Sequence, residues 1–294
     1  MSGQIFDRVA LIGIGLIGSS LARVLRRDAP GTVIVACARR AETLAAVRRL
    51  GIADETTDDP AVAVRDADLV VLATPLSAYG DVGRRIAPVL RDGAIVTDVG
   101  SVKGAAIEAL RPVLPNRVHF VPGHPVAGTE HSGPEAGFAE LFHDRWCILT
   151  PLPETDPEAV AKVARLWEGA GMRVAMMAAD HHDKVLAVTS HLPHLIAYTI
   201  VGTATELGQD LQSEVVAYSA GGFRDFTRIA ASDPVMWRDI FLSNREAVLE
   251  LLQRFSEDLT ALQRAIRRGD GETLYNWFDH TRAIRRSIIE AKQA

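Results

Sequence analysis

The chain has 294 residues, of which 48% are hydrophobic and 23% charged, and its formal net charge is -5. This composition is typical of a globular protein and excludes a disordered or fibrous chain, and the negative charge disfavours a nucleic-acid or acidic-membrane surface. The length allows two domains, each with its own hydrophobic core. The two cysteines, Cys37 and Cys147, lie in apolar runs and offer neither a disulfide framework nor a metal quartet.

The first stretch of the chain predicts a dinucleotide-binding turn. An apolar run over residues 8–13 leads into the pattern G-x-G-x-x-G, and a helical pattern follows over 19–27. The first glycine allows a tight turn, the second lets a pyrophosphate approach the backbone, and the third lets the helix pack on the strand. Free amides at the helix start favour an anion. The expected cofactor-binding residues here are Gly13, Gly15, Leu16, Ile17 and Gly18.

More apolar runs follow, alternating with segments of helical length. The predicted strands are 33–38, 68–73, 94–98 and 119–121, and two more, 146–150 and 173–177, complete the first domain around a helix that starts at 156–158. Continuous apolar strands alternating with helices predict a parallel sheet covered on both faces, a Rossmann-like α/β domain. The strand ends meet at one edge, so we expect Thr74, Pro75, Ser101 and His124 to converge around a nicotinamide.

His124 follows the predicted strand 119–121 and stands between Gly123 and Pro125. These neighbours predict an irregular segment from which the imidazole projects at the ligand-binding edge. A structural loop histidine remains the alternative from this residue alone. We interpret His124 as a candidate catalytic group because the other predicted binding residues lie at the same edge.

The end of the second predicted strand bears on cofactor choice. An acidic residue there normally holds the ribose 2′-hydroxyl of NAD, but this chain has Arg39 and Arg40. Guanidinium groups match an extra 2′-phosphate well. The sequence therefore favours NADP+ over NAD+, with solvent-facing arginines as the alternative.

Helical periodicity replaces the strand pattern after residue 178, so we predict a dinucleotide-binding domain over 1–178 and an all-α domain over 179–294. A long helix is expected over 180–206, with His181, His182 and Asp183 at its solvated start. His191 and His194 share a helix face, but no further metal ligands can be placed, and no metal is predicted. No apolar run is judged long enough to span a membrane and no signal peptide is recognised, so a cytoplasmic protein is expected.

The segment 221–228 combines a double glycine with two arginines, and we expect it to be irregular and suited to binding anions. Arg228 is a candidate for anchoring a carboxylate, because its planar fork can donate two hydrogen bonds. The last predicted helices, 242–268 and 273–292, carry wide apolar stripes. Such stripes are commonly buried against a second copy, so a homodimer through the helical domain is expected.

Taken together, these motifs make the chain similar to the prephenate and arogenate dehydrogenases of tyrosine biosynthesis, also called cyclohexadienyl dehydrogenases. The resemblance runs from Val9 to about Ala291 and rests on five separated motifs in family order. They are the segments 13–18, 98–103, 123–128, 190–194 and 221–228 with Trp237.

The resemblance implies an oxidative decarboxylation of prephenate or arogenate, with hydride transfer to NAD(P)+. It implies that His124 is the catalytic histidine and that Ser101 hydrogen-bonds either His124 or the substrate hydroxyl. The substrate pocket would contain His194, Gly221, Arg228 and Trp237, the last from the same chain or shared across the dimer. The residue that distinguishes prephenate from arogenate is left open, with Asp225 and Glu130 as candidates.

Two rival hypotheses remain. A β-hydroxyacid dehydrogenase or imine reductase pairs a similar first domain with a helical second one and uses a lysine on the long helix, for which Lys184 is the candidate. In that reading the Gly123-His124-Pro125 segment has no role. A dinucleotide-sensing protein without turnover is the other alternative, but the chain has no recognisable DNA-binding motif.

Overall fold

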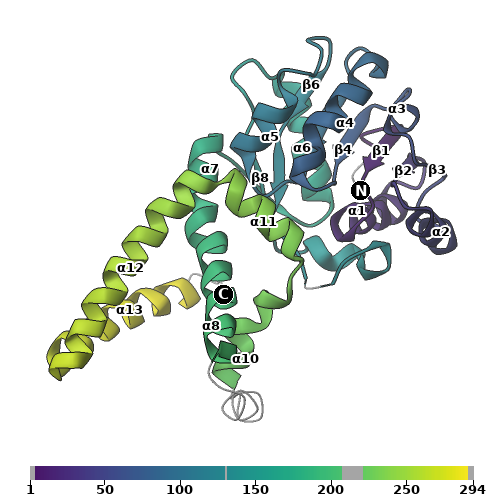
Figure 1. Cartoon of the computed structure of the whole chain (residues 1–294). Coiled ribbons are helices and arrows are strands. Elements are labelled where there is room, and N and C mark those ends of the chain that lie inside the picture. Colours follow the sequence, from purple (N-terminus) through teal and green to yellow (C-terminus); the bar gives the residue numbers. More distant parts are fainter. Residues whose placement is uncertain (1–3, 130, 207–220, 291–294) are drawn as a thin grey trace. The chain divides into compact units, whose positions relative to one another are not determined.

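The computed structural model describes residues 4–129, 131–206 and 221–290 of the chain (Figure 1). Glu130, one candidate for substrate discrimination, lies outside the described residues. The chain divides into two compact units, Met1–Arg245 and Glu246–Ala294, which are described separately. The first unit carries a Rossmann-like parallel sheet followed by helices, so the predicted fold class is confirmed.

A six-stranded parallel sheet forms the centre of the first unit (Figure 1), in the order β3-β2-β1-β4-β5-β6. Its strands are β1 (Arg8–Ile12), β2 (Val33–Cys37), β3 (Glu55–Thr57), β4 (Leu69–Leu72), β5 (Ile95–Asp98) and β6 (His119–Val121). β1, β4 and β5 are almost entirely buried, as expected for strands covered on both faces. β3 was not among the predicted strands, because it is short, polar and at the sheet edge and so lacks an apolar run.

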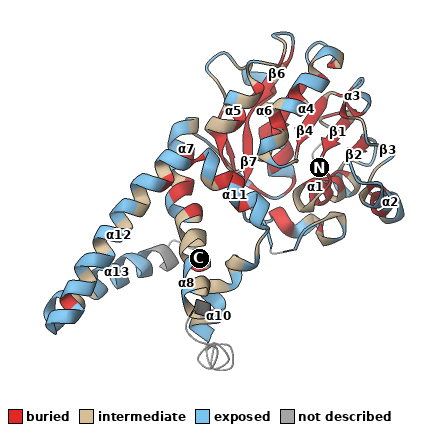
Figure 2. Cartoon of the chain, viewed as in Figure 1, coloured by how far each residue is buried: buried red, intermediate tan, exposed pale blue. Residues whose placement is uncertain are grey.

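Helices cover both faces of this sheet, whose strands are largely buried (Figure 2). Alternate residues of β1 belong to two separate cores. Val9 and Leu11 belong to the core beneath α1 and α6, while Ala10 and Ile12 belong to the core beneath α3, α4 and α5. The helices of this part are α1 (Leu16–Asp28), α2 (Ala41–Leu50), α3 (Pro60–Ala63), α4 (Tyr79–Ile86), α5 (Lys103–Leu110) and α6 (Pro157–Gly169). Short 3-10 turns are η1 (Leu76–Ala78), η2 (Ala87–Val89), η3 (Pro134–Ala136) and η4 (Ala139–Phe142).

A second, three-stranded sheet lies beside the first, in the order β7-β8-β9. Its strands are β7 (Gly123–Pro125), β8 (Trp146–Leu149) and β9 (Arg173–Met176). β7 runs antiparallel to β8, and β8 runs parallel to β9. The strands at 146–150 and 173–177 were predicted, but they form this separate sheet rather than extending the six-stranded one.

The rest of the first unit is helical in its described part. It contains α7 (Ala179–Leu186), a π-helical turn η5 (Ala187–His191), α8 (Leu192–Glu206), α10 (Gly221–Thr227), the 3-10 turn η6 (Arg228–Ala231) and α11 (Pro234–Ser243). The long helix predicted over 180–206 is confirmed, with a π-helical turn in its middle. The prediction of an irregular segment over 221–228 is wrong: α10 packs against α8, and this contact outweighs the poor helix propensity of two glycines.

The second unit contains α12 (Arg245–Arg268) and α13 (Gly271–Glu290). Its described residues expose many large apolar side chains, namely Leu249, Leu259, Ile266, Tyr275, Trp277, Phe278 and Ile284. The predicted boundary near residue 178 falls between β9 and α7, whereas the division into compact units falls after Arg245. The assignment of 1–178 and 179–294 to two functional domains stays a prediction.

The continuous helix Ala179–Ala204 is long and apolar enough to cross a membrane by length and composition, with a mean hydropathy of 1.4. The prediction that no segment reaches this threshold is therefore wrong. The same helix carries the buried polar residues His182, Asp183 and His191, which pack against other parts of the chain. A helix within a folded protein passes the same test, so the composition of this helix does not assign a membrane location.

The glycine turn after β1 yields a stability prediction. Gly13 has φ +98°, and an added Cβ would lie 2.4 Å from the carbonyl oxygen of Ala73. We expect Gly13→Ala to lower the free energy of unfolding by about 2 kcal/mol or more, because the left-handed backbone and the clash both oppose a side chain. Urea unfolding followed by circular dichroism measures this change.

Gly15→Ala is the matched control, because an added Cβ there meets nothing within 4 Å. Its free energy of unfolding should stay within about 0.5 kcal/mol of the parent. Equal destabilisation by the two variants would show that the turn does not constrain Gly13.

Candidate active site

His124 lies in the middle of β7 and is 7% exposed. It pairs with Ile148 of β8, so the expectation of an irregular segment is wrong. β7 is at the edge of its sheet, where Pro125 ends the strand and its missing N–H disrupts no ladder. The strand gives His124 a fixed backbone, and the side chain is held in the interior.

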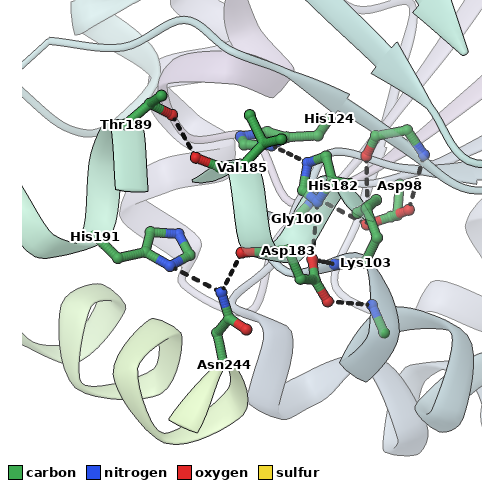
Figure 3. Close-up of polar contacts among 12 residues, drawn as sticks. Asp98, Gly100, Lys103, His124, His182, Asp183, Val185, Thr189, His191 and Asn244 are labelled. Carbon is green, nitrogen blue, oxygen red and sulfur yellow. Dashed lines mark hydrogen bonds and ion pairs between the residues drawn. The ribbon is translucent and has the colours of Figure 1, made fainter. Parts of the chain in front are cut away.

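The ring of His124 contacts a second histidine that comes from the helical part of the chain (Figure 3). His124 Nδ1 lies 2.9 Å from His182 Nε2, and the rings meet edge to face. His182 Nδ1 lies 2.8 Å from Asp183 Oδ1. His182 is fully buried and Asp183 is 8% exposed, so the prediction of a solvated helix start at these two residues is wrong. His182 contacts β7 through His124, a tertiary contact that no local sequence pattern indicates.

The surroundings of His124 favour a neutral imidazole. Burial is the largest cause that lowers its pKa well below the usual 6.5, and the neighbouring His182, Lys103 and His191 lower it further. A neutral imidazole carries one lone pair on a ring nitrogen and can accept a proton. His124 therefore has the protonation state that a general base requires near pH 7.

A buried ion pair between Lys103 and Asp98 fixes the backbone next to His124 (Figure 3). Both side chains are fully buried, and Lys103 Nζ also donates to the carbonyl oxygen of Gly123 at 2.6 Å. Asp98 accepts hydrogen bonds from the amides of Gly100 and Gly123 and from the Tyr79 hydroxyl. Burial lowers the pKa of Lys103, and Asp98 opposes that shift. This network joins β5, α5 and β7 around the candidate base.

Ser101 is half-buried in the turn between β5 and α5. The turn is fixed on one side by the Gly100 amide, which donates to Asp98, and on the other by Lys103. Among the described residues Ser101 makes no hydrogen bond to His124. The structure therefore places Ser101 in the same network of elements without a direct contact to the histidine.

The glycine turn forms an open approach to the start of α1. An added Cβ at Gly18 would lie 2.3 Å from the carbonyl oxygen of Gly13, so this glycine permits close packing, whereas the space beside Gly15 is empty. Leu16 and Ile17 are the first residues of α1. Gly15 is the N-cap residue and provides no side-chain hydrogen bond, which leaves the first amides of α1 available to an anion.

Two more expected cofactor residues follow β4. Thr74 Oγ1 is buried without a hydrogen-bond partner in the described part of the chain, and Pro75 is exposed at the start of η1. An orphaned buried hydroxyl at the carboxyl end of a strand fits a site that a ligand completes. Arg39 and Arg40 are both exposed directly after β2, at the position expected to meet the adenosine ribose.

The expected substrate residues gather on α8, η6 and α11. The His194 ring stacks on Trp237 with centroids 3.6 Å apart, so these two predicted pocket residues meet within one chain. Burial is the main cause that lowers the pKa of His194, and the nearby positive charge of Arg228 lowers it further. Trp237 also packs against Val102, the residue after Ser101. Gly221 is exposed at the start of α10.

His191 is a buried residue beside this group for which the sequence predicted no role. Its Nδ1 lies 3.1 Å from Asn244 Nδ2, which also donates to the backbone oxygen of Asp183 (Figure 3). An amide nitrogen only donates, so His191 carries its proton on Nε2. Within the described residues, neither His191 Nε2 nor Trp237 Nε1 has a hydrogen-bond partner. Two buried donors at the expected substrate site thus lack an acceptor.

The histidine, cysteine and acidic side chains of the site are possible metal ligands. The described residues contain no group of three histidine, cysteine or acidic side chains placed to hold an ion. His191 and His194 share a helix, but their Nδ1 atoms bond to Asn244 and to the Ser190 carbonyl oxygen, respectively.

Comparison with known families gives two adjoining matches. Residues 21–176 match the model of the prephenate dehydrogenase nucleotide-binding domain, and residues 178–280 match that of the prephenate dehydrogenase dimerization domain. Together these matches cover most of the chain.

Individual proteins agree with the family matches. The chain is 44% identical to a cyclohexadienyl dehydrogenase of Zymomonas mobilis, over 97% of each sequence. Its structure is similar to that of prephenate dehydrogenase from Aquifex aeolicus in complex with hydroxyphenyl propionate and NAD+, with a TM-score of 0.89, 36% identity, and coverage of 96% of this chain and 98% of that chain. It is also similar to Synechocystis arogenate dehydrogenase, with a TM-score of 0.79, 28% identity, and coverage of 95% and 99%.

The buried ion pair yields a prediction. We expect Lys103→Met to lower the free energy of unfolding by about 3–5 kcal/mol, because the carboxylate of Asp98 would remain buried without its counter-charge. Chemical denaturation of the purified variant measures the loss.

Lys162→Met serves as a control, because Lys162 forms an ion pair with Glu158 at the surface of α6. Exposed pairs contribute little, and a change within about 1 kcal/mol is expected there. A Lys103→Met variant as stable as this control would contradict the assigned importance of the buried pair.

Proposed function

This chain belongs to the prephenate dehydrogenase family, and on that premise we propose that it catalyses the oxidative decarboxylation of prephenate or arogenate with NAD(P)+ as hydride acceptor, in tyrosine biosynthesis. The observation that carries the proposal is the buried His124, held neutral beside the edge where the nucleotide-binding turn lies. The substrate side supplies Arg228 and the two unpaired donors of His191 and Trp237.

The residues at the sheet edge fit a dinucleotide. The empty space at Gly15 and the uncapped start of α1 would accept the pyrophosphate, and the orphaned Thr74 hydroxyl offers a further polar contact. When bound there, the nicotinamide supplies the chemistry of accepting a hydride from the hydroxyl-bearing ring carbon. Arg39 and Arg40 support a preference for NADP+, because both residues are exposed after the end of β2 and their guanidinium groups would match a 2′-phosphate.

His124 acts as the general base in the proposed reaction. It takes the proton of the substrate hydroxyl while the ring carbon that bears this hydroxyl loses its hydride, and a carbonyl forms. The bond from the ring to the carboxylate then breaks, carbon dioxide leaves, and the bonding electrons complete an aromatic ring. The carbonyl oxygen becomes a phenolate, which takes the proton back from His124 to form the phenol. Aromatisation supplies the driving force, so the protein has mainly to orient the substrate and accept the proton. Ser101 would bind the same hydroxyl from the turn before α5.

The opposite end of the substrate is anionic and needs donors. Arg228 can bind a carboxylate with two parallel hydrogen bonds. His191 Nε2 and Trp237 Nε1 are buried donors that an anionic oxygen would satisfy. His194 stacks on Trp237 and thereby fixes the indole. Gly221 stays a predicted pocket residue without a contact that supports it.

Prephenate and arogenate differ in one substituent, an oxo group against an ammonium, and both are kept as substrates in this proposal. The candidate discriminating residue in the described chain, Asp225, is exposed on α10. The hydroxyacid-dehydrogenase alternative is weakened, because its candidate lysine, Lys184, is exposed while His124 is buried. The sensing alternative gives no role to the buried base.

The assembly proposed for the chain is a homodimer through its helical part. Residues 178–280 match a domain described as a dimerization domain, and the second unit exposes the apolar side chains that a partner copy would cover. The cytoplasmic location, and the absence of nucleic-acid and membrane partners, stay predictions.

The role of His124 can be tested by substitution. We expect His124→Asn to lower kcat with the better of prephenate and arogenate by about two orders of magnitude or more, since a general base is lost. Binding of the dinucleotide, followed by quenching of intrinsic fluorescence, should remain unchanged. His131→Asn, at an exposed histidine of the next loop, is the control. Full turnover by His124→Asn would remove His124 from the mechanism.

Substrate and cofactor choice are measured together, from the rise in reduced-nicotinamide absorbance over the four combinations of prephenate or arogenate with NAD+ or NADP+. We expect turnover in at least one combination and a higher kcat/KM with NADP+. Arg39→Ala should lower kcat/KM for NADP+ by about tenfold and leave that for NAD+ nearly unchanged, because a lost charge-assisted hydrogen bond costs about 1.5 kcal/mol or more. Arg84→Ala, at an exposed arginine of α4, is the control. An unchanged ratio in Arg39→Ala would contradict the role given to this arginine.

A further inference from the structure

The contacts around Asp183 determine the direction of every hydrogen bond that leads from it to His124. The Lys103 amide donates to Asp183 Oδ1 at 2.7 Å, and the Gly104 amide donates to Oδ2 at 2.8 Å. Backbone amides only donate, so both carboxylate oxygens act as acceptors. The amides stand at the N-terminus of α5, where a negative charge is favoured. Asp183 is therefore an ionised acceptor.

The donors and acceptors in the hydrogen bonds of the two histidines follow from this (Figure 3). Because Asp183 accepts, His182 Nδ1 donates to it across 2.8 Å. In the neutral ring the proton on Nδ1 leaves the lone pair on Nε2. That lone pair lies 2.9 Å from His124 Nδ1, so His124 must donate from Nδ1. The remaining lone pair of His124 is consequently on Nε2.

We propose that His182 and Asp183 are positioning residues that hold the neutral His124 with its proton on Nδ1, which keeps Nε2 free to accept the substrate hydroxyl proton. The inference deepens the proposed function and rests on it. Within the described residues, His124 Nε2 makes no hydrogen bond, so the base end of the ring is available. The opposite tautomer would place a proton on Nε2 and disable the base.

The same series of hydrogen bonds, from Asp183 through His182 to His124, stabilises the imidazolium that proton transfer produces. Once His124 Nε2 has taken the hydroxyl proton, the imidazolium still donates from Nδ1 to His182, and the Asp183 carboxylate lies behind that ring. The charged groups facing the pair from the other elements are Lys103 on α5 and Asp98 on β5, which neutralise each other. The titratable neighbours are His191 on η5 and Cys147 on β8, and burial raises the pKa of that thiol, which stays neutral. Asp98 is already paired with Lys103, so the negative charge that stabilises the His124 imidazolium comes from Asp183.

The tautomer can be measured directly, without substrate. Nitrogen-15 NMR of histidine-labelled protein at pH 7.5 distinguishes a protonated ring nitrogen from one with a lone pair. We expect His124 to carry its proton on Nδ1 in the parent protein. In His182→Leu the acceptor is lost, and the Nε2-protonated form should grow. A parent protein with Nε2 of neutral His124 protonated overturns the proposal, whether or not the enzyme turns over a cyclohexadiene.

Kinetics supply the second readout. His182→Leu should lower kcat at least tenfold while the KM values for substrate and dinucleotide change less than twofold, because binding groups are untouched. His182→Gln should recover much of that loss, since its amide oxygen can accept from His124 while its nitrogen donates to Asp183. His181→Leu, at the exposed neighbouring histidine, should be as active as the parent.

The outcomes separate the two proposals. Unchanged kcat in His182→Leu overturns the positioning role while the proposed function stands. A parent protein inactive on both substrates overturns the proposed function, and the NMR measurement still decides the tautomer. Circular dichroism confirms folding of each variant, and a variant that does not fold leaves the parent NMR result and His182→Gln to decide.

Discussion

The carboxylate of Asp183 is the constraint on which the arrangement of the site depends. Its two oxygens bond to the amides that begin α5, so a helix of the C-terminal part is attached to the helix that follows the Asp98–Lys103 pair. The chain of contacts continues through His182 to His124. One buried set of polar contacts therefore positions His124, the turn between β5 and α5, and the helix α7. Removing the charge of Asp98, Lys103 or Asp183 would leave a buried partner without compensation. An incomplete network of this kind would strongly destabilise the protein.

The balance of charge inside this set also explains the neutral base. Lys103 would raise the potential around His124, but Asp98 lies in direct contact with it. Burial remains the dominant cause that lowers the pKa of His124. The site thus combines two features that usually oppose one another. Its buried interior disfavours the imidazolium form of His124, whereas the Asp183 carboxylate, two hydrogen bonds away, stabilises that form. The resting state stays neutral, and the charged state is still supported.

The sequence predicted the parts of the fold that local patterns determine. The strands around β1 and β4 are continuous apolar runs, the glycine turn has its own spacing, and the helix over 180–206 has a clear period, so each could be recognised. β3 was missed because it is polar and at the edge. The helical state of 221–227 was missed because packing against α8, and not propensity, decides it.

The candidate site divides in the same way. His124 and Arg228 stand out by their neighbours in the sequence, but nothing local distinguishes the buried His182 from the exposed His181 beside it. One residue of shift along α7 decides whether an imidazole meets β7 or water. Lys103 lay within a recognised motif, yet its burial and its contact with Asp98 follow only from the way β5 and α5 fold back on β7. His124 and His182 are 58 positions apart in the chain, so their contact can be recognised only in the tertiary structure.

The π-helical turn Ala187–His191 has a geometric effect on which side chains share a side of the long helix. In a regular α-helix, His182 and His191 would be separated by nine steps of about 100°, or about half a turn, and would face opposite directions. The wider turn accommodates about one extra residue, so the nine positions advance as about eight and the net angle falls to about 80°. The turn therefore acts as a phase correction between α7 and α8. One continuous helix therefore carries His182 and Asp183 near its start and His194, which stacks on Trp237, further along.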